Sequence, residues 1–177
     1  MKSFQSASLK EITSKLFLSE TFDFFRLQEA VFSCAVNYSI DGKVNRDFYR
    51  DASAKTPQAG SETAGDAPQE ETVFMPWRDL RPICFSMIRG KRTPLSFRLV
   101  FLVPAREATA RFSTLANAAE SGISSFVLVL QYREEKITAT TAVSYCRFAL
   151  DRGPEKNWDT EVAGWFRKEN LPFQETA

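Results

Sequence analysis

The clearest strand pattern in this chain is LSFRLVFLVP, which occupies residues 95–104. Its apolar side chains recur at every second position, and this period predicts a β-strand with one face toward a core. Pro104 ends the pattern, because proline has no N–H to donate to a neighbouring strand. The apolar positions of the alternation are Leu95, Phe97, Leu99, Phe101 and Val103.

Two further segments downstream predict strands. Residues 126–133 are nearly all apolar on both faces, which is typical of a strand in the middle of a sheet. Glu134 and Glu135 then predict a tight turn into a second long strand, Ile137–Leu150, which is rich in threonine, alanine and valine. Residues 105–121, by contrast, are small and mixed, and they fit either a weak helix or an exposed loop.

Upstream, alternating apolar residues predict a long strand over residues 32–40. The dipeptide Asp41-Gly42 follows at once and is typical of a type I′ hairpin turn, because glycine tolerates a positive φ. We therefore expect a return strand through Val44–Tyr49. The alternating residues are Phe32, Cys34, Val36, Tyr38 and Ile40.

Apolar residues at helical spacing predict two helices in the first half of the chain. The first begins at Ser8–Glu11, a capping box in which the two polar side chains satisfy free N–H groups. The second begins with Asp79 as its N-cap, holds Pro82 in its first turn and ends just before Gly90.

A third helix is predicted near the end of the chain and begins at Asp159 or Thr160. Three tryptophans adjoin the helical stripes, and we expect them to pack in the core, with an exposed partner surface as the alternative. They are Trp77, Trp158 and Trp165.

The order of these elements predicts an α+β fold. The short links between strands favour a mainly antiparallel sheet of about five strands with helices packed on one face. We expect residues 1–177 to form a single domain. Residues 51–72 contain no aromatic residue, valine, isoleucine or leucine, and we expect a flexible loop rich in acidic residues, alanine, serine and glycine.

The composition excludes several classes of enzyme, because the chain contains no histidine. Ser-His-Asp triads, Cys-His pairs and histidine-containing zinc sites are therefore ruled out. There is no G-x-G-x-x-G sequence, and Gly90-Lys91-Arg92-Thr93 lacks the upstream glycine of a P-loop. We expect no cofactor and no resident metal, and we lean toward a protein without catalytic activity.

The same inspection predicts a cytoplasmic protein without membrane contact. No apolar run approaches the ~20 residues that cross a bilayer, and the first residues lack the apolar core of a secretory signal. The three cysteines, Cys34, Cys84 and Cys146, are widely spaced and odd in number, so we expect free thiols.

Positive charge is concentrated in one region, which we regard as a candidate anion or nucleic-acid site. Arginine side chains bind phosphate and carboxylate oxygens through two parallel hydrogen bonds. The net charge is only +1, so any such attraction is local. The region contains Arg78 and a single acid, Asp79, and the candidate residues are Arg81, Arg89, Lys91, Arg92 and Arg98.

An ordinary surface role for these cations stays open. Cations near the C-terminus of a helix complement the helix dipole and keep the following turn soluble. Phosphate, in contrast, prefers helix N-termini.

Several short motifs resemble an uncharacterised family of small proteins from Gram-positive anaerobes. The likeness spans nearly the whole chain except residues 51–72, and it implies neither an activity nor catalytic residues. The motifs are Ile88-Arg89-Gly90-Lys91-Arg92-Thr93-Pro94, Thr21-Phe22-Asp23, Ile40-Asp41-Gly42 with Asn45, Trp77-x-x-Leu80-Arg81-Pro82 and Asn157-Trp158-Asp159.

The order of elements also resembles the domain of a sliding clamp, and residues 135–141 with Arg147–Leu150 look like a clamp strand pair. In clamps, basic helix faces line the DNA, whereas the cations here gather at one turn. The likeness concerns topology and carries little weight for function.

Three hypotheses about function follow. The first is a non-catalytic binding or interaction module that holds an anionic ligand or nucleic acid at the basic region. The second is a clamp-like accessory protein associated with DNA. The third is an enzyme that uses carboxylates or Mg²⁺, without histidine, on a phosphorylated substrate. The partner stays unknown, and a homo-oligomer stays open.

Overall fold

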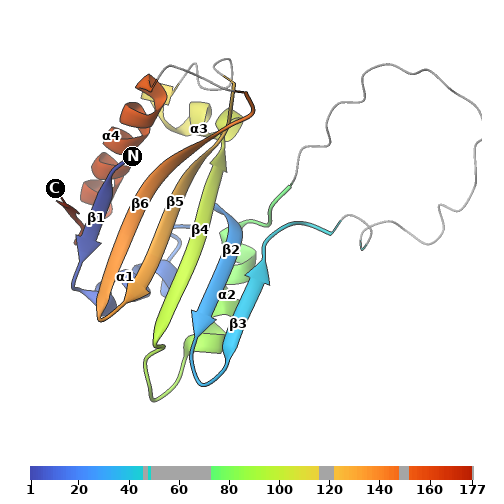
Figure 1. The fold of residues 1–177 in the computed structure, drawn as a ribbon, viewed down its shortest axis with the longest axis vertical. Coiled ribbons are helices and arrows are strands. Elements are labelled where there is room, and N and C mark those ends of the chain that lie inside the picture. The colour runs from blue at the N-terminus through green and yellow to red at the C-terminus, as the bar shows by residue number, and fades with distance from the viewer. Residues whose placement is uncertain (46–47, 49–72, 116–121, 148–151, 177) are drawn as a thin grey trace, which may run out of the picture.

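The fold is an antiparallel sheet with helices on one side, as Figure 1 shows. The computed structural model describes residues 1–45, 48, 73–115, 122–147 and 152–176. In this part of the chain the sheet has seven strands in the order β3-β2-β4-β5-β6-β1-β7, and every neighbouring pair is antiparallel. The predicted α+β class is confirmed, with seven strands in place of about five.

The long central strands match the alternation in the sequence. Strands β4 and β5 pair without interruption from Ser96 opposite Arg133 to Pro104 opposite Ser125. Glu134 and Glu135 form the predicted tight turn, with φ of 52° and 62°. The strand bounds are β1 (Ser3–Ser6), β2 (Arg26–Ser33), β3 (Asn37–Asp41), β4 (Ser96–Pro104), β5 (Ile123–Arg133), β6 (Lys136–Tyr145) and β7 (Gln174–Thr176).

Four α-helices are described, and their apolar faces join one core with the sheet. The short helix α3 shows that the first part of the segment 105–121 is helical, whereas residues 116–121 lie outside the described residues. The helix bounds are α1 (Leu9–Leu18), α2 (Trp77–Ile88), α3 (Ala105–Arg111) and α4 (Gly153–Lys168), with a 3₁₀ turn at Ser113–Leu115.

The core is rich in aromatic rings. Phe32, Phe97 and Leu128, from three different strands, belong to the same buried cluster, as the predicted shared sheet requires. The predicted core role of the tryptophans is confirmed: Trp77, Trp158 and Trp165 are 0%, 1% and 7% exposed.

The predicted strand over residues 32–40 is wrong in one respect, because the chain turns in its middle. The amide of Cys34 donates to the carbonyl of Val36 at 3.1 Å, and Phe32 lies opposite Tyr38 on the neighbouring strand. A three-residue turn keeps Phe32 and Tyr38 on the same face. Alternation alone therefore cannot distinguish this hairpin from one long strand.

Gly42 does not form the predicted type I′ turn. It lies where the backbone of Leu27 passes too close for a side chain. Its φ is not in the positive range, and a Cβ atom there would lie 1.9 Å from the carbonyl oxygen of Leu27. The predicted return strand is not formed at Val44, whose amide donates to the carbonyl of Val73 at 2.8 Å. Most of its remaining residues, and all of the predicted flexible segment 51–72, lie outside the described residues.

Helix α2 begins three residues earlier than predicted. Pro76 takes the N-cap position in place of Asp79, and Pro82 lies inside the helix. The amide of Trp77 donates to the carbonyl of Phe25 at 2.9 Å, so a long-range contact fixes the start. At the other end Arg89 is extended, and the φ of Gly90 is not in the left-handed range.

The start of α4 also differs from the prediction, and the cap of α1 does so in part. Helix α4 begins at Gly153 and not at Asp159 or Thr160, with Pro154 in its first turn, where its missing N–H costs nothing. Helix α1 begins where predicted, but the side chain of Ser8 makes no capping hydrogen bond.

Candidate functional site

A groove of about 480 Å³ lies between helix α1 and the segment 89–94 that follows helix α2. One face of helix α1 lines the groove along the whole helix, from Leu9 to Leu18. The sequence gives this helix a period that buries Ile12 and Leu16 against the sheet, and the groove residues lie beside that stripe. The groove is thus a seam between two packed helices and the start of β4.

The floor of the groove is aromatic. The ring centroid of Phe17 lies 6.1 Å from that of Phe85 and 6.2 Å from that of Phe97. Phe17 and Phe97 are 4% and 2% exposed, so the floor is the outer surface of the core. The apolar lining is completed by Leu9, Leu18, Ile88 and Pro94.

Four cationic side chains line the walls of the groove, and no carboxylate does. Lys10 lies on the wall formed by α1, while Arg89, Lys91 and Arg92 lie on the opposite wall. All four are exposed. Within the described residues, none of them is paired with an acidic side chain. The groove thus combines an apolar floor with positive walls in a chain of net charge +1.

The candidate residue Arg81 lies outside this groove and binds within the protein. Its guanidinium donates to the carbonyl of Ser19, the C-cap residue of α1, and lies 3.3 Å from Asp23. A cation at this position complements the negative end of the α1 dipole. Burial raises the pKa of the Asp23 carboxyl, which the charge of Arg81 only partly offsets.

The candidate residue Arg98 lies on the other face of the sheet. It is exposed and follows Phe97, which is buried beneath the groove, and successive side chains of a strand point to opposite faces. Its guanidinium donates to Glu29 on the neighbouring strand β2 at 2.7 Å. The structure therefore brings together three of the five predicted residues and separates Arg81 and Arg98 from them.

Lys10 also lines the groove, but it is not among the candidate residues predicted from the sequence, although its position in a helix is unusual. It stands in the first turn of α1, where the helix dipole disfavours a positive charge. No side chain caps this turn, which also contains Glu11, and Leu9 and Lys10 of the turn line the groove.

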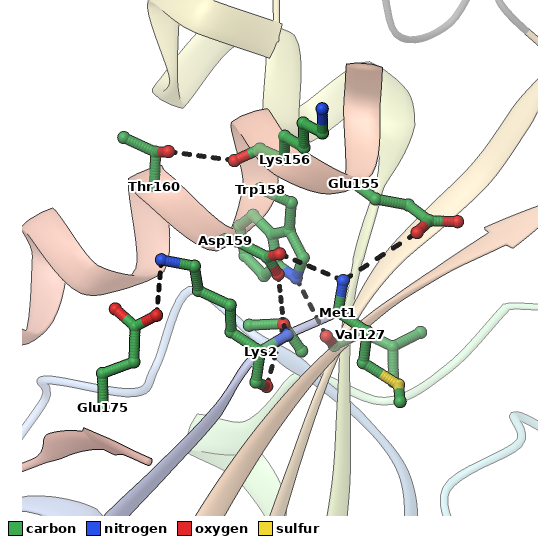
Figure 2. Close-up of polar contacts among 10 residues, drawn as sticks. Met1, Lys2, Val127, Glu155, Lys156, Trp158, Asp159, Thr160 and Glu175 are labelled. Atoms are coloured by element: carbon green, nitrogen blue, oxygen red, sulfur yellow. Dashed lines mark hydrogen bonds and ion pairs between the residues drawn. The ribbon is translucent and has the colours of Figure 1, made fainter. Parts of the chain in front are cut away.

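A buried carboxylate elsewhere in the fold is fully engaged by its own chain. Figure 2 shows Asp159 of α4 beside the amino group of Met1, which lies 3.0 Å from its Oδ2 atom. The hydroxyl of Thr141 donates to the other oxygen of the same carboxylate. Nearby, Lys2, which directly precedes β1, pairs with Glu175 of β7 at 2.6 Å. This cluster holds the sheet edge to α4.

A second depression, of about 500 Å³, lies over strands β2 and β3. It mixes Glu29 and Asp41 with Lys43, so it offers no uniform charge to a ligand. Across the described part of the chain, no three cysteine or acidic side chains are grouped so that they could hold a metal ion. In the same residues, no helix has the length and apolarity that a membrane span needs.

Comparison with known proteins assigns the chain to a family. No curated protein matches it significantly. The search of solved structures also finds no significant match. The model of a family of unknown function (DUF5721) matches residues 15–174, which include the last turn of α1, all of α2 and the cationic segment 89–94. This chain therefore belongs to that family of unknown function.

Proposed function

We propose that this protein is a non-catalytic binding module that holds an anionic ligand in the groove between α1 and segment 89–94. The observation that supports it is the lining: four exposed cations, no carboxylate and an apolar floor in one concave site. Surface cations that only keep a protein soluble are usually interspersed with acids. Here, they converge on a groove instead.

The energetics require the ligand to use both parts of the groove. An exposed ion pair contributes about 0.2–1 kcal/mol, so four such pairs together contribute at most about 4 kcal/mol. That free energy corresponds to a millimolar dissociation constant. Apolar contact with the floor has to supply the rest, at about 25 cal/mol for each Å² of apolar surface buried.

A charge-reversal experiment tests the anion site. Arg89→Glu, Lys91→Glu and Arg92→Glu are combined in one variant, and retention on phosphocellulose is measured against salt concentration. We expect the natural protein to be retained and the variant to elute at much lower salt, because exposed ion pairs are screened by salt.

The matched control carries the same change in total charge at three cations away from the groove. Lys136→Glu, Arg147→Glu and Lys156→Glu alter exposed residues of the hairpin turn, the end of β6 and the first turn of α4. We expect this variant to keep most of its retention. If both variants lose retention equally, net charge alone governs binding and the groove is not the site.

We also propose that the protein works in the cytoplasm, where thiols stay reduced. All three cysteines are unpaired in the structure, with Cys84 buried and Cys146 exposed. The clamp-like and Mg²⁺-dependent alternatives have no particular observation in their favour. DNA retention that depends on salt would support the first, and thermal stabilisation by Mg²⁺ with a phosphorylated metabolite would support the second.

A further inference from the structure

We infer that the ligand of this groove is an acidic amphipathic helix of a partner protein. This inference rests on the proposed function, because it names the class of ligand for the same groove. It is carried by the length of the groove, the exposure of leucines on or next to its walls and the distribution of charge on its two walls.

The groove has the length of a short helical segment. Its lining along α1 runs from Leu9 to Leu18, which at 1.5 Å per residue is about 14 Å. A partner helix laid along this wall makes about two and a half turns. That length presents apolar side chains at positions i, i+3 or i+4, and i+7, the spacing with which amphipathic helices fill hydrophobic grooves.

Exposed leucines stand on the α1 wall and next to the opposite wall of the groove. Leu18, which lines it, is 64% exposed, and Leu95, which follows the opposite wall at Pro94, is 74% exposed. A site for a small molecule encloses most of its ligand. Exposed leucines at the edge of a groove instead fit the side chains of a larger partner, because that partner covers the surface beyond the concavity.

Positive charge stands on both walls. Lys10 lies on the α1 wall, and Arg89, Lys91 and Arg92 lie opposite, with the apolar floor between them. The complementary surface is an apolar stripe with acidic residues on both of its sides. An amphipathic helix has this arrangement, whereas an amphiphile with a single carboxylate reaches one wall only.

The floor is poorly suited to single-stranded nucleic acid. Proteins that bind it stack bases on the exposed faces of aromatic side chains. Phe17 and Phe97 are 4% and 2% exposed, so most of each ring is covered by the core. Rings that are covered to this extent leave no open face on which a base could stack.

Selection from a peptide library tests the inference. The immobilised full-length chain is presented with displayed random peptides of about 16 residues, long enough for about four helical turns. We expect enrichment of sequences with apolar residues at helical spacing and with aspartate or glutamate on both sides of the stripe. Enriched sequences without acids, sequences without that spacing, or no enrichment over a bare surface would each overturn the inference.

Two matched substitutions locate the binding. Leu18→Ser removes an exposed leucine of the groove, and Ile83→Ser removes an exposed apolar residue of α2 outside it, 49% exposed. By fluorescence anisotropy, we expect the first to weaken binding of an enriched peptide about tenfold and the second by less than about twofold. Equal effects would place the peptide elsewhere.

Two further probes, together with retention on phosphocellulose, test this inference separately from the proposed function. A fluorescent fatty acid and a labelled oligonucleotide are tested against the same two variants. If either probe binds in a manner that depends on Leu18 while peptides do not, the helix assignment is wrong. Retention on phosphocellulose that is lost in the groove variant alone would still support an anion site. The proposed function itself fails only if that retention does not depend on the groove.

Discussion

Replacing each buried tryptophan by phenylalanine measures what two indole hydrogen bonds contribute to the fold. The indole of Trp77 donates to the carbonyl of Leu16 at 3.1 Å, and that of Trp158 donates to the carbonyl of Val127 at 2.9 Å. The indole nitrogen of Trp165 is buried without a hydrogen-bond partner. All three substitutions delete the same atoms from similarly buried sites, so their differences isolate the hydrogen bond.

The two donors differ in what their loss leaves behind. Leu16 lies in the last turn of α1, where carbonyls have no partner within the helix. Its carbonyl would be left buried and unsatisfied in Trp77→Phe. Val127 lies in an interior strand that is paired on both sides, so its carbonyl remains within a ladder.

We therefore expect Trp77→Phe to lower the free energy of unfolding most, Trp158→Phe less and Trp165→Phe least. The free energy of unfolding of Trp77→Phe should be about 2 kcal/mol lower than that of Trp165→Phe, because only Trp77→Phe loses a hydrogen bond and leaves an unsatisfied acceptor. In urea, with a slope of about 2 kcal/mol per M, the midpoints should differ by about 1 M. Circular dichroism follows unfolding without relying on the substituted fluorophores. If Trp165→Phe destabilises the protein as much as Trp77→Phe, the reasoning is wrong.

Three further predictions follow from single residues. Burial raises the pKa of Asp23 above 3.8, so its contribution to stability is complete below about pH 4 and is lost as pH rises through the folded value. In urea unfolding, the free energy of unfolding of Asp23→Asn should rise relative to that of the natural protein between about pH 4 and about pH 7. A difference that stays constant with pH would contradict this. Gly42→Ala should cost about 3 kcal/mol or more, because its Cβ meets a backbone oxygen, while Gly90→Ala, with nothing within 4 Å, should stay within about 0.5 kcal/mol. Burial also raises the pKa of Cys84 to about 12, so a thiol reagent followed by mass spectrometry should modify exposed Cys146 in the folded protein and Cys84 only on unfolding.

The sheet was predictable where many residues repeat the same alternation. Strands β4, β5 and β6 each run for nine residues or more and bury alternate residues along one face, and β4 also buries Val100 and Leu102 on the other. The short strands β1 and β7 have four and three residues, too few for a period to appear. They form strands because β1 lies along β6 and β7 lies along β1, which is a property of the assembled fold.

The candidate site was predictable only where its residues are neighbours in sequence. Arg89, Lys91 and Arg92 lie within four positions, so they stay together in any fold. Arg81 and Arg98 belong to a helix and a strand, whose geometry turns them away from that segment. Lys10 joins the site only through the packing of α1 beside α2, which no local pattern specifies.

The position of Phe17 shows why the groove and the core depend on each other. Its ring contacts Trp77 and Phe97 in the interior, and it also lines the groove. A groove whose floor is made of core side chains cannot collapse unless the core repacks, and cores are packed as densely as organic crystals. The apolar surface is therefore pre-formed, so a ligand does not spend free energy on opening it. For the same reason truncating Phe17 would unfold the protein and report nothing about binding, whereas exposed Leu18, one residue on, separates the two roles.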